Sequence, residues 1–446
     1  MKAVETIKNI WKIEDLRNRI GITLLFVLIY RFGSFIVLPG VNPQALGELK
    51  DQTSEGLMAL LDMFSGGAFS NASIFALGIM PYISASIVIQ LLSIAVPSFQ
   101  KMQKEGESGR KKITQYTRYL TVLILLFQGP SYLINLSLQM SGAMPTDLWF
   151  TISSTIILCG GSMFVMWLGE RITDKGIGNG ISFIIMVGII ARFPAAIIQE
   201  FTLSLTGGGG GLIKFLLEII FLVVVIAAAV MLVQGVRKVP VQYAKKMVGN
   251  KQAGGVRQYI PLKVNASGVM PIIFAQAIMF IPLTVAPMIS GGDGQPGKIL
   301  SAFMDNNGFW YSLVFALLII AFTYFYTAIT INPTQMAEDM KRNGGFIPGI
   351  KPGKPTAEYI DLIMSRITFP GSLFLAAIAV LPAIVSSDAA FKMNMQFAQF
   401  FGGTSLLILV GVVLDTLQQV ESHLLMRHYD GLLKSGRIRG RSGVIN

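Results

Sequence analysis

The chain alternates between apolar runs of membrane length and short polar segments rich in glycine. A helix of about 20 apolar residues is long enough to cross the hydrocarbon core of a bilayer. Ten such runs predict ten transmembrane helices, at residues 20–38, 72–96, 116–138, 148–169, 179–200, 212–234, 267–289, 309–331, 367–386 and 397–420. Because ten is even, both termini are expected on the same side of the membrane.

The second run differs from the others because polar residues and a proline interrupt it. In SIFALGIMPYISASIVIQLL, residues 73–92, Pro81 is followed by Ser84, Ser86 and Gln90. The segment just before it, MFSGGAFSNA, is too polar and too rich in glycine to span lipid. The pattern predicts a short polar stub followed by a helix broken at Pro81, where water or protein satisfies the freed backbone carbonyl.

Composition supports a membrane protein. Hydrophobic residues make up 52% of the 446 residues and charged residues 13%, against about 25% charged in a typical soluble domain. The single cysteine, Cys159, excludes a disulfide framework. His423 and His428 are expected in a solvated tail helix rather than a metal site. The basic N-terminal stretch resembles a signal sequence but has no cleavage site, so we expect a retained first helix.

The basic residues predict the orientation in the membrane. With the ten spans above, 30 of the 36 lysines and arginines fall on one side, with both termini. Three more, Arg31, Arg192 and Lys214, lie within spans or at their ends. An excess of lysine and arginine is typical of cytoplasmic loops. The richer side is therefore predicted to be cytoplasmic.

Two of the cytoplasmic loops are long, at residues 235–266 and 332–366, and they are basic and rich in glycine. Attraction to anionic lipid is one interpretation of such loops. A large anionic partner such as ribosomal RNA is another. Phe346, Ile347 and Pro348 at an expected exposed tip favour a protein partner, because lipid attraction needs only charge.

The sequence carries no motif for catalysis or for nucleotide binding. KGIGNGIS, residues 175–182, contains glycines but joins two spans, so we interpret it as a tight turn with Asn179 capping the next helix. Glu218 and Asp415 are too few for an intramembrane proton relay. The chain is therefore expected to form a passage and not an enzyme, and to need no cofactor.

A passage can be closed by an apolar constriction that excludes water. Ile79 and Ile83 lie one helical turn apart, and Ile181 and Ile185 have the same spacing. Taken alone, such pairs are more typical of contacts with lipid or with a neighbouring helix.

Six long stretches resemble the SecY family, the channel-forming subunits of the bacterial protein translocon. They are MFSGGAFSNASIFALGIMPYISASIVIQLL, KEGESGRKKITQYTRY, MWLGERITDKGIGNGISFII, YIPLKVNASGVMPIIFAQAI, INPTQMAEDMKRNGGFIPGIKPG and FGGTSLLILVGVVLDT. The resemblance runs in order from about residue 10 to 435. It implies an all-α membrane protein whose ten helices form two inverted, pseudo-symmetric halves, residues 1–200 and 201–446, around an hourglass pore with a lateral gate.

The resemblance also implies roles for particular residues. The waist of the pore would be a ring of six isoleucines: Ile79, Ile83, Ile181, Ile185, Ile273 and Ile408. The polar stub, about residues 58–70, would be the plug of the outer funnel, including Asp62, Met63, Phe64, Ser65, Gly66 and Gly67. We expect the two glycines to let this stub bend away, and its polarity to suit a wet vestibule. The lateral gate would include Ser84, Ile87, Gln90, Gln128 and Ile281, a polar seam that parts easily.

The cytoplasmic loops would bind a motor or the ribosome through basic residues: Lys245, Lys246, Arg257, Lys341, Arg342 and Lys351. At the tip of the second loop this chain reads PGIKPG where most of the family reads PGIRPG, so Lys351 replaces an arginine.

The implied function is to pass unfolded secretory polypeptides across the bacterial inner membrane and to release transmembrane segments sideways into it. The implied partners are SecE and SecG in the membrane, the SecA motor ATPase, the ribosome, preproteins with their signal sequences, and the lipid bilayer, with no role for DNA. The sequence fits two other classes of membrane protein less well. A small-solute transporter should show a charged or unwound site at mid-membrane in both halves, and a lipid scramblase or scaffold would not need the two long basic loops.

Overall fold

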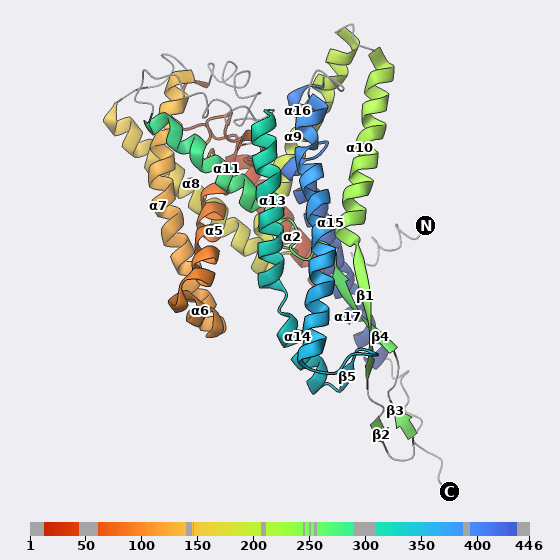
Figure 1. Cartoon of the computed structure of the whole chain (residues 1–446). Helices are drawn as coiled ribbons and strands as arrows, with labels where there is room; N and C mark the ends of the chain where they lie inside the picture. The colour runs from red at the N-terminus through yellow and green to blue at the C-terminus, as the bar shows by residue number, and fades with distance from the viewer. Residues whose placement is uncertain are drawn as a thin grey trace. The chain divides into compact units, whose positions relative to one another are not determined.

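The computed structural model describes residues 13–43, 61–139, 145, 147–206, 211–243, 246–248, 251–253, 257–289, 308–386 and 393–434. Within them the chain is mostly helical, as predicted (Figure 1). It forms two compact units. Unit 1 contains residues 61–192 with the N-terminal part of the chain and the residues from Val412 onwards, and unit 2 contains Phe193–Gly411.

Unit 1 is built mainly of helices. Its helices are α2 (Glu14–Gly33), α5 (Met80–Ala95), α6 (Pro97–Lys104), α7 (Glu107–Gln139), α8 (Leu148–Lys175), the first part of α9 (Gly180–Thr206) and the end of α17 (Gly403–Lys434). α7 packs against α5, α6 and α8, and α8 packs against α2. Asn179 caps α9 as predicted, accepting a hydrogen bond from the backbone N–H of Ile181 at 3.2 Å.

The break predicted at Pro81 is wrong in its position. α5 begins at Met80, so Pro81 lies in the first turn, where its missing N–H would have had no helical partner anyway. Residues 65–79 form turns instead of helix, apart from a bridge between Val37 and Ser73. The sharp bend, 102°, falls between α5 and α6, where Pro97 follows the extended Val96.

Unit 2 is also built mainly of long helices. They are α10 (Gly211–Gln234), α11 (Met270–Ile289), α13 (Phe309–Thr330), α14 (Pro333–Arg342), α15 (Lys354–Ser386) and α16 (Met395–Ala398), with the remainder of α9 and the start of α17. α13 packs against both α11 and α15, and α15 also contacts α10, α14 and α16.

A small antiparallel sheet joins the two long loops, which the sequence analysis did not predict. β1 (Val236–Tyr243) lies between β4 (Arg257–Lys263) and β5 (Gly345–Phe346). In Figure 1 these strands lie beyond the lower ends of α10 and α15. A separate pair, β2 (Lys246–Val248) and β3 (Lys251–Ala253), extends the first loop. Val239 and Val241 are buried, whereas Lys238 and Pro240 beside them in β1 are exposed, as expected for a strand with one covered face.

The sheet has its own apolar core. Ile347 is 2% exposed and packs with Val241, Leu262 and Ile360. The prediction that Phe346, Ile347 and Pro348 form an exposed apolar tip is therefore wrong for Ile347, and Phe346 is half-buried in β5. Pairing of β5 with β1 brings Ile347 over the apolar face of β1, which no local pattern in the sequence reveals.

Seven helices in the described part of the chain are long and apolar enough to cross a membrane, or eight if the bent pair α5–α6 counts as one span. A helix occurs within each of the ten predicted spans. α2 carries Glu14, Asp15, Arg17 and Arg19 in its first turns, which lower its hydropathy. The number of crossings, ten, stays a prediction.

Candidate functional site

The plug segment, predicted at residues 58–70 and described from Leu61 onwards, is one turn of helix followed by tight turns. The turn ends at two glycines in the left-handed region, Gly66 with φ of 66° and Gly67 with φ of 91°. The N–H of Gly67 donates to the carbonyl of Asp62 at 2.8 Å, a bond typical of helix ends. Residues other than glycine rarely adopt these φ values, so both glycines are required to end the helix here.

The plug segment is buried, although its sequence is polar. Asp62, Ser65 and Ser70 are 6%, 4% and 1% exposed, and Met63 and Phe64 are buried beside them. The expectation that its polarity suits a wet vestibule is not met, because protein groups cover these side chains and bind them. Buried polar groups are stable only when they are hydrogen-bonded.

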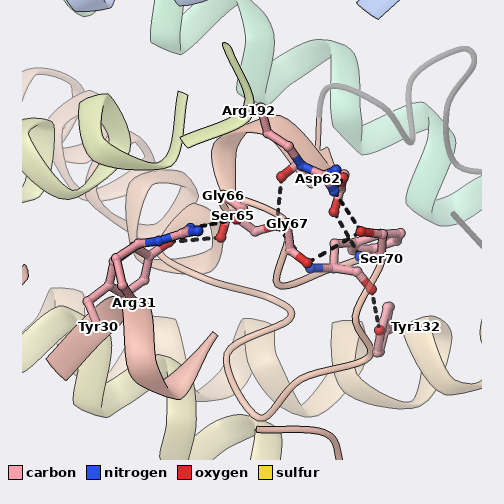
Figure 2. A network of polar contacts seen from close by, with 10 residues as sticks. Tyr30, Arg31, Asp62, Ser65, Gly66, Gly67, Ser70, Tyr132 and Arg192 are labelled. Atoms are coloured by element: carbon pink, nitrogen blue, oxygen red, sulfur yellow. Dashed lines mark hydrogen bonds and ion pairs between the residues drawn. The ribbon is translucent and has the colours of Figure 1, made fainter. Parts of the chain in front are cut away.

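One arginine of α9 binds both ends of the plug segment (Figure 2). Arg192 forms an ion pair with Oδ2 of Asp62, and its Nη2 donates a hydrogen bond to Oγ of Ser70 at 2.6 Å. The other carboxylate oxygen of Asp62 accepts the backbone N–H of Ser70 at 2.8 Å. The side chain of Asp62 is 9% exposed and that of Arg192 28%, so this pair is mostly shielded from solvent.

Three further side chains hold backbone carbonyls of the plug segment. Arg31 donates from Nη1 to the carbonyl of Gly66 at 2.7 Å, and Tyr30 donates its hydroxyl to that of Ser65 at 3.0 Å. From α7, Tyr132 donates to the carbonyl of Phe69 at 3.0 Å. Figure 2 shows these donors reaching the segment from two helices, Tyr30 and Arg31 from α2 and Tyr132 from α7. Backbone that is not helical is therefore satisfied by side chains, as membrane interiors require.

From the sequence, Arg31 and Arg192 were expected only as charges within spans or at their ends, and neither Tyr30 nor Tyr132 was expected to have a role. An ionisable residue in a transmembrane helix usually has a functional partner, so the two arginines carried a usable signal. Nothing local to Tyr30 or Tyr132 distinguishes them from other aromatic residues of these helices.

Four of the six predicted ring isoleucines lie in unit 1. Ile79 is the N-cap of α5 and Ile83 follows one turn later, its N–H donating to the carbonyl of Ile79 at 3.1 Å. Both are buried, as is Ile185 on α9, whereas Ile181 is half-buried.

The remaining two ring residues belong to unit 2. Ile408 on α17 is fully buried and Ile273 on α11 is half-buried. The grouping of all six into one ring stays a prediction.

The predicted gate residues of α5 make their hydrogen bonds within their own helix. Ser84 donates to the carbonyl of Met80 at 3.2 Å, and the side-chain amide of Gln90 donates to Oγ of Ser86 at 3.3 Å. Ile87 is buried, and Gln128 on α7 is half-buried. Ile281 lies in α11, but its side chain is outside the described part of the chain.

The predicted docking residues lie on the two loops of unit 2. Lys341 and Arg342 are exposed in the last turn of α14, and Lys351 is exposed just beyond the sheet core. Lys246 begins β2 and Arg257 begins β4, and the side chains of both are outside the described part. Lys245 lies outside the described residues.

Within the described ranges, no three acidic, histidine or cysteine side chains come together to hold a metal ion. The buried ionisable groups of the plug network are paired with each other instead. This arrangement consists of charged and neutral hydrogen bonds that hold a short segment in place and that can be broken to release it.

Known proteins that resemble this chain belong to the SecY family. The family model SecY matches residues 73–417. The protein translocase subunit SecY of Thermotoga maritima is 41% identical over 447 residues, covering 98% of this chain and 99% of that protein.

Solved structures share the fold. One is a structure of a SecY protein, whose plug domain is described as stabilising the closed state of the translocation channel and maintaining a membrane seal. Its TM-score is 0.62 at 18% sequence identity, and the alignment covers 91% of this chain and 92% of that one. Another, Sec61 in the canine ribosome-channel complex, has a TM-score of 0.57 and 17% identity, with 91% and 92% covered. The family match and the near-complete alignment to a translocase subunit together establish that the chain belongs to the SecY family.

Proposed function

We propose that this chain is the channel-forming subunit of a bacterial translocon, which passes unfolded secretory polypeptides across the inner membrane and releases transmembrane segments sideways into the bilayer. The observation that carries the proposal is the plug segment. A buried, non-helical segment is held among membrane-length helices by bonds from the side chains of Arg31, Tyr30, Tyr132 and Arg192. Such a segment has no role in a purely structural bundle, but it suits a removable stopper.

The channel has two proposed halves, residues 1–200 and 201–446, with a ring of six isoleucines at its waist. The ring is supported by the burial of Ile79, Ile83, Ile185 and Ile408. Apolar side chains at a constriction exclude water and ions by dewetting. They can separate around a passing polypeptide without losing a specific bond, which suits a channel whose substrates differ in sequence.

The lateral gate is proposed to include Ser84, Ile87, Gln90, Gln128 and Ile281. Its opening is favoured by the hydrogen bonds of Ser84 and Gln90, which stay within α5. A helix whose polar groups are already satisfied internally leaves no unpaired donor when it separates from its neighbour. Polar groups at the gate then cost little when a signal sequence enters.

Both termini and the two basic loops are proposed to lie in the cytoplasm, from the asymmetry of lysine and arginine. The docking surface for the SecA motor ATPase or the ribosome is proposed at Lys245, Lys246, Arg257, Lys341, Arg342 and Lys351. The sheet beneath the second loop supports this proposal because it gives the basic residues a rigid base. SecE and SecG are proposed as the membrane partners, and the chain itself as a non-enzymatic subunit.

The test is transport by vesicles that contain this chain with its membrane partners. A signal-bearing polypeptide should be translocated only when a cytosolic motor and ATP are supplied. Deletion of residues 60–70 should leave the helices folded, because those residues do not span the membrane. It should also raise the resting ion conductance, because the proposed stopper is then missing. Uptake of a small solute without a motor, with no polypeptide transport, would favour the transporter class instead.

A further inference from the structure

The plug segment forms a closed loop by itself, and Arg192 binds that loop from α9. Asp62 and Ser70 are joined by a bond between Oδ1 of Asp62 and the N–H of Ser70 at 2.8 Å. The hydroxyl of Ser70 also donates back to the carbonyl of Gly67 at 3.3 Å. These bonds lie inside the segment, so they persist if it moves as one piece.

The bonds to Arg192 are of a different kind, because they join the segment to α9. The guanidinium binds Oδ2 of Asp62 and Oγ of Ser70, which are the two ends of the same loop. Both contacts come from one nitrogen, Nη2, whose two N–H groups can donate to two acceptors at once. One side chain therefore holds the whole loop, and releasing that side chain frees both ends together.

The charges of Arg192 and Asp62 make this contact stronger than the others on the segment. Arg31, Tyr30 and Tyr132 bind only neutral carbonyls of the backbone. A hydrogen bond with one ionised partner is about twice as strong as a neutral one. This applies to the bond of Arg31, but of these contacts the one between Arg192 and Asp62 has charges on both partners. Removing one partner of a shielded ion pair leaves the other charge uncompensated, which is costly.

We propose that Arg192 is a latch residue whose ion pair with Asp62 sets how readily the plug segment leaves its seat. The proposal rests on the function proposed above for that segment. Asp62 has two separable roles: its Oδ1 closes the loop and its Oδ2 engages the latch. Arg192 has only the latch role, because both of these bonds join α9 to the plug segment.

The two roles predict different results for different substitutions. Asp62→Asn keeps an oxygen that accepts the N–H of Ser70 but removes the charge, so the loop stays closed and the latch is lost. Arg192→Gln removes the latch from the other side. Arg192→Lys keeps the charge on a shorter side chain and should fall between Arg192→Gln and the parent.

The experiment measures the resting conductance of the intact complex in planar bilayers, with a strong-signal preprotein as a test of folding. Asp62→Asn and Arg192→Gln should each raise the conductance by on the order of tenfold, consistent with loss of a shielded ion pair. The double variant should leak no more than Arg192→Gln alone, because the ion pair that Asp62→Asn removes is already absent there. Arg192→Gln should add nothing when residues 60–70 are already deleted.

A matched control removes a different ion pair of unit 1. Arg118 donates from Nη2 to Glu170 at 2.6 Å, joining α7 to α8. Arg118→Gln should leave the resting conductance at the parental level. A rise equal to that of Arg192→Gln would mean general loosening of the unit and would overturn the latch.

The latch and the plug fail in distinguishable ways. If the deletion leaks and both single variants conduct like the parent, the plug stands and the latch is wrong. If the deletion itself does not leak, the function proposed for the segment is wrong. Leaks that add in the double variant also contradict the proposal, and either single variant suffices for the comparison if the other does not fold.

Discussion

Gly66 of the plug segment and Gly188 of α9 approach each other so closely that neither position has room for a methyl group. A Cβ on Gly66 would lie 2.9 Å from Cα of Gly188, and a Cβ on Gly188 would lie 2.9 Å from the carbonyl oxygen of Phe64. Glycine therefore serves two purposes at residue 66, a left-handed turn and a close contact. The contact sets how deeply the segment sits against α9.

Gly188→Ala is expected to displace the plug segment from α9, although the substitution removes none of the groups that hydrogen-bond to the segment. The added methyl meets backbone atoms, which cannot move aside as a flexible side chain can, and overpacking of this kind costs about 1–3 kcal/mol. Resting conductance in planar bilayers should rise, and export of preproteins with weak signals should improve. Gly160→Ala is the control, because nothing lies within 4 Å of a Cβ there; equal effects of the two substitutions would contradict the prediction.

Ile83→Asn is expected to let water into the waist of the channel. The side chain is 8% exposed, and a buried amide without a partner costs about 1–3 kcal/mol. The closed state should lose stability, so a reporter with a defective signal sequence should be exported better than by the parent. Ile83→Leu keeps an apolar side chain of equal volume and should behave like the parent.

Ile408→Asn tests the same role from unit 2, where the isoleucine is fully buried. If both asparagine variants export the defective reporter no better than their leucine controls, these positions do not form the constriction.

The apolar pattern predicted the helices well because each run reports directly on burial in lipid or protein. The predicted cap at Asn179 also occurs, since capping depends on neighbouring residues. Pairings between distant segments could not be predicted in this way. Arg192 and Ser70 are 122 positions apart, and an arginine in a span indicates that a partner exists without identifying it.

The sheet formed by β1, β4 and β5 was not predicted for a similar reason. β1 has the alternation of a strand, with Val239 and Val241 buried, but its basic residues and glycine-rich surroundings favoured a loop. β5 is two residues long and exists only because Gln242 and Tyr243 of β1 pair with it. A strand this short has no periodicity to detect, so the burial of Ile347 could not be inferred from its sequence.

Ile347→Ala is expected to loosen the base of the second long loop, residues 332–366. Truncating a fully buried isoleucine costs about 2–5 kcal/mol, and a core as small as this one has few other contacts to compensate. Limited proteolysis should cut the two loops faster, and stimulation of the motor ATPase should fall. Pro348→Ala changes an exposed neighbour and should alter neither measurement; unchanged proteolysis of Ile347→Ala would contradict the role of the sheet.

Lys351 stands where the resemblance to the SecY family implies an arginine. Its carbonyl accepts the hydroxyl of the buried Thr356 at 2.9 Å, so the backbone is held while the side chain is exposed. If the partner binds this position through a fork, Lys351→Arg should strengthen motor ATPase stimulation during translocation, because arginine binds a carboxylate or phosphate through two parallel bonds. If the partner senses only charge, Lys351→Arg should be silent, whereas Lys351→Glu should lower the stimulation in either case.

Lys354→Glu separates local recognition from the net charge of the loop. Lys354 is exposed and begins α15, three residues from Lys351. A docking contact at the loop tip requires Lys351→Glu to be the more damaging change, because a direct bond is lost there, whereas screening over about 8 Å at physiological ionic strength weakens the effect of a charge three residues away. Equal losses from both substitutions would indicate a general electrostatic attraction, to lipid or to an anionic surface. If Lys351→Glu stimulates the motor as well as the parent does, the loop tip is not the docking point, and its basic residues then act by attraction to anionic lipid.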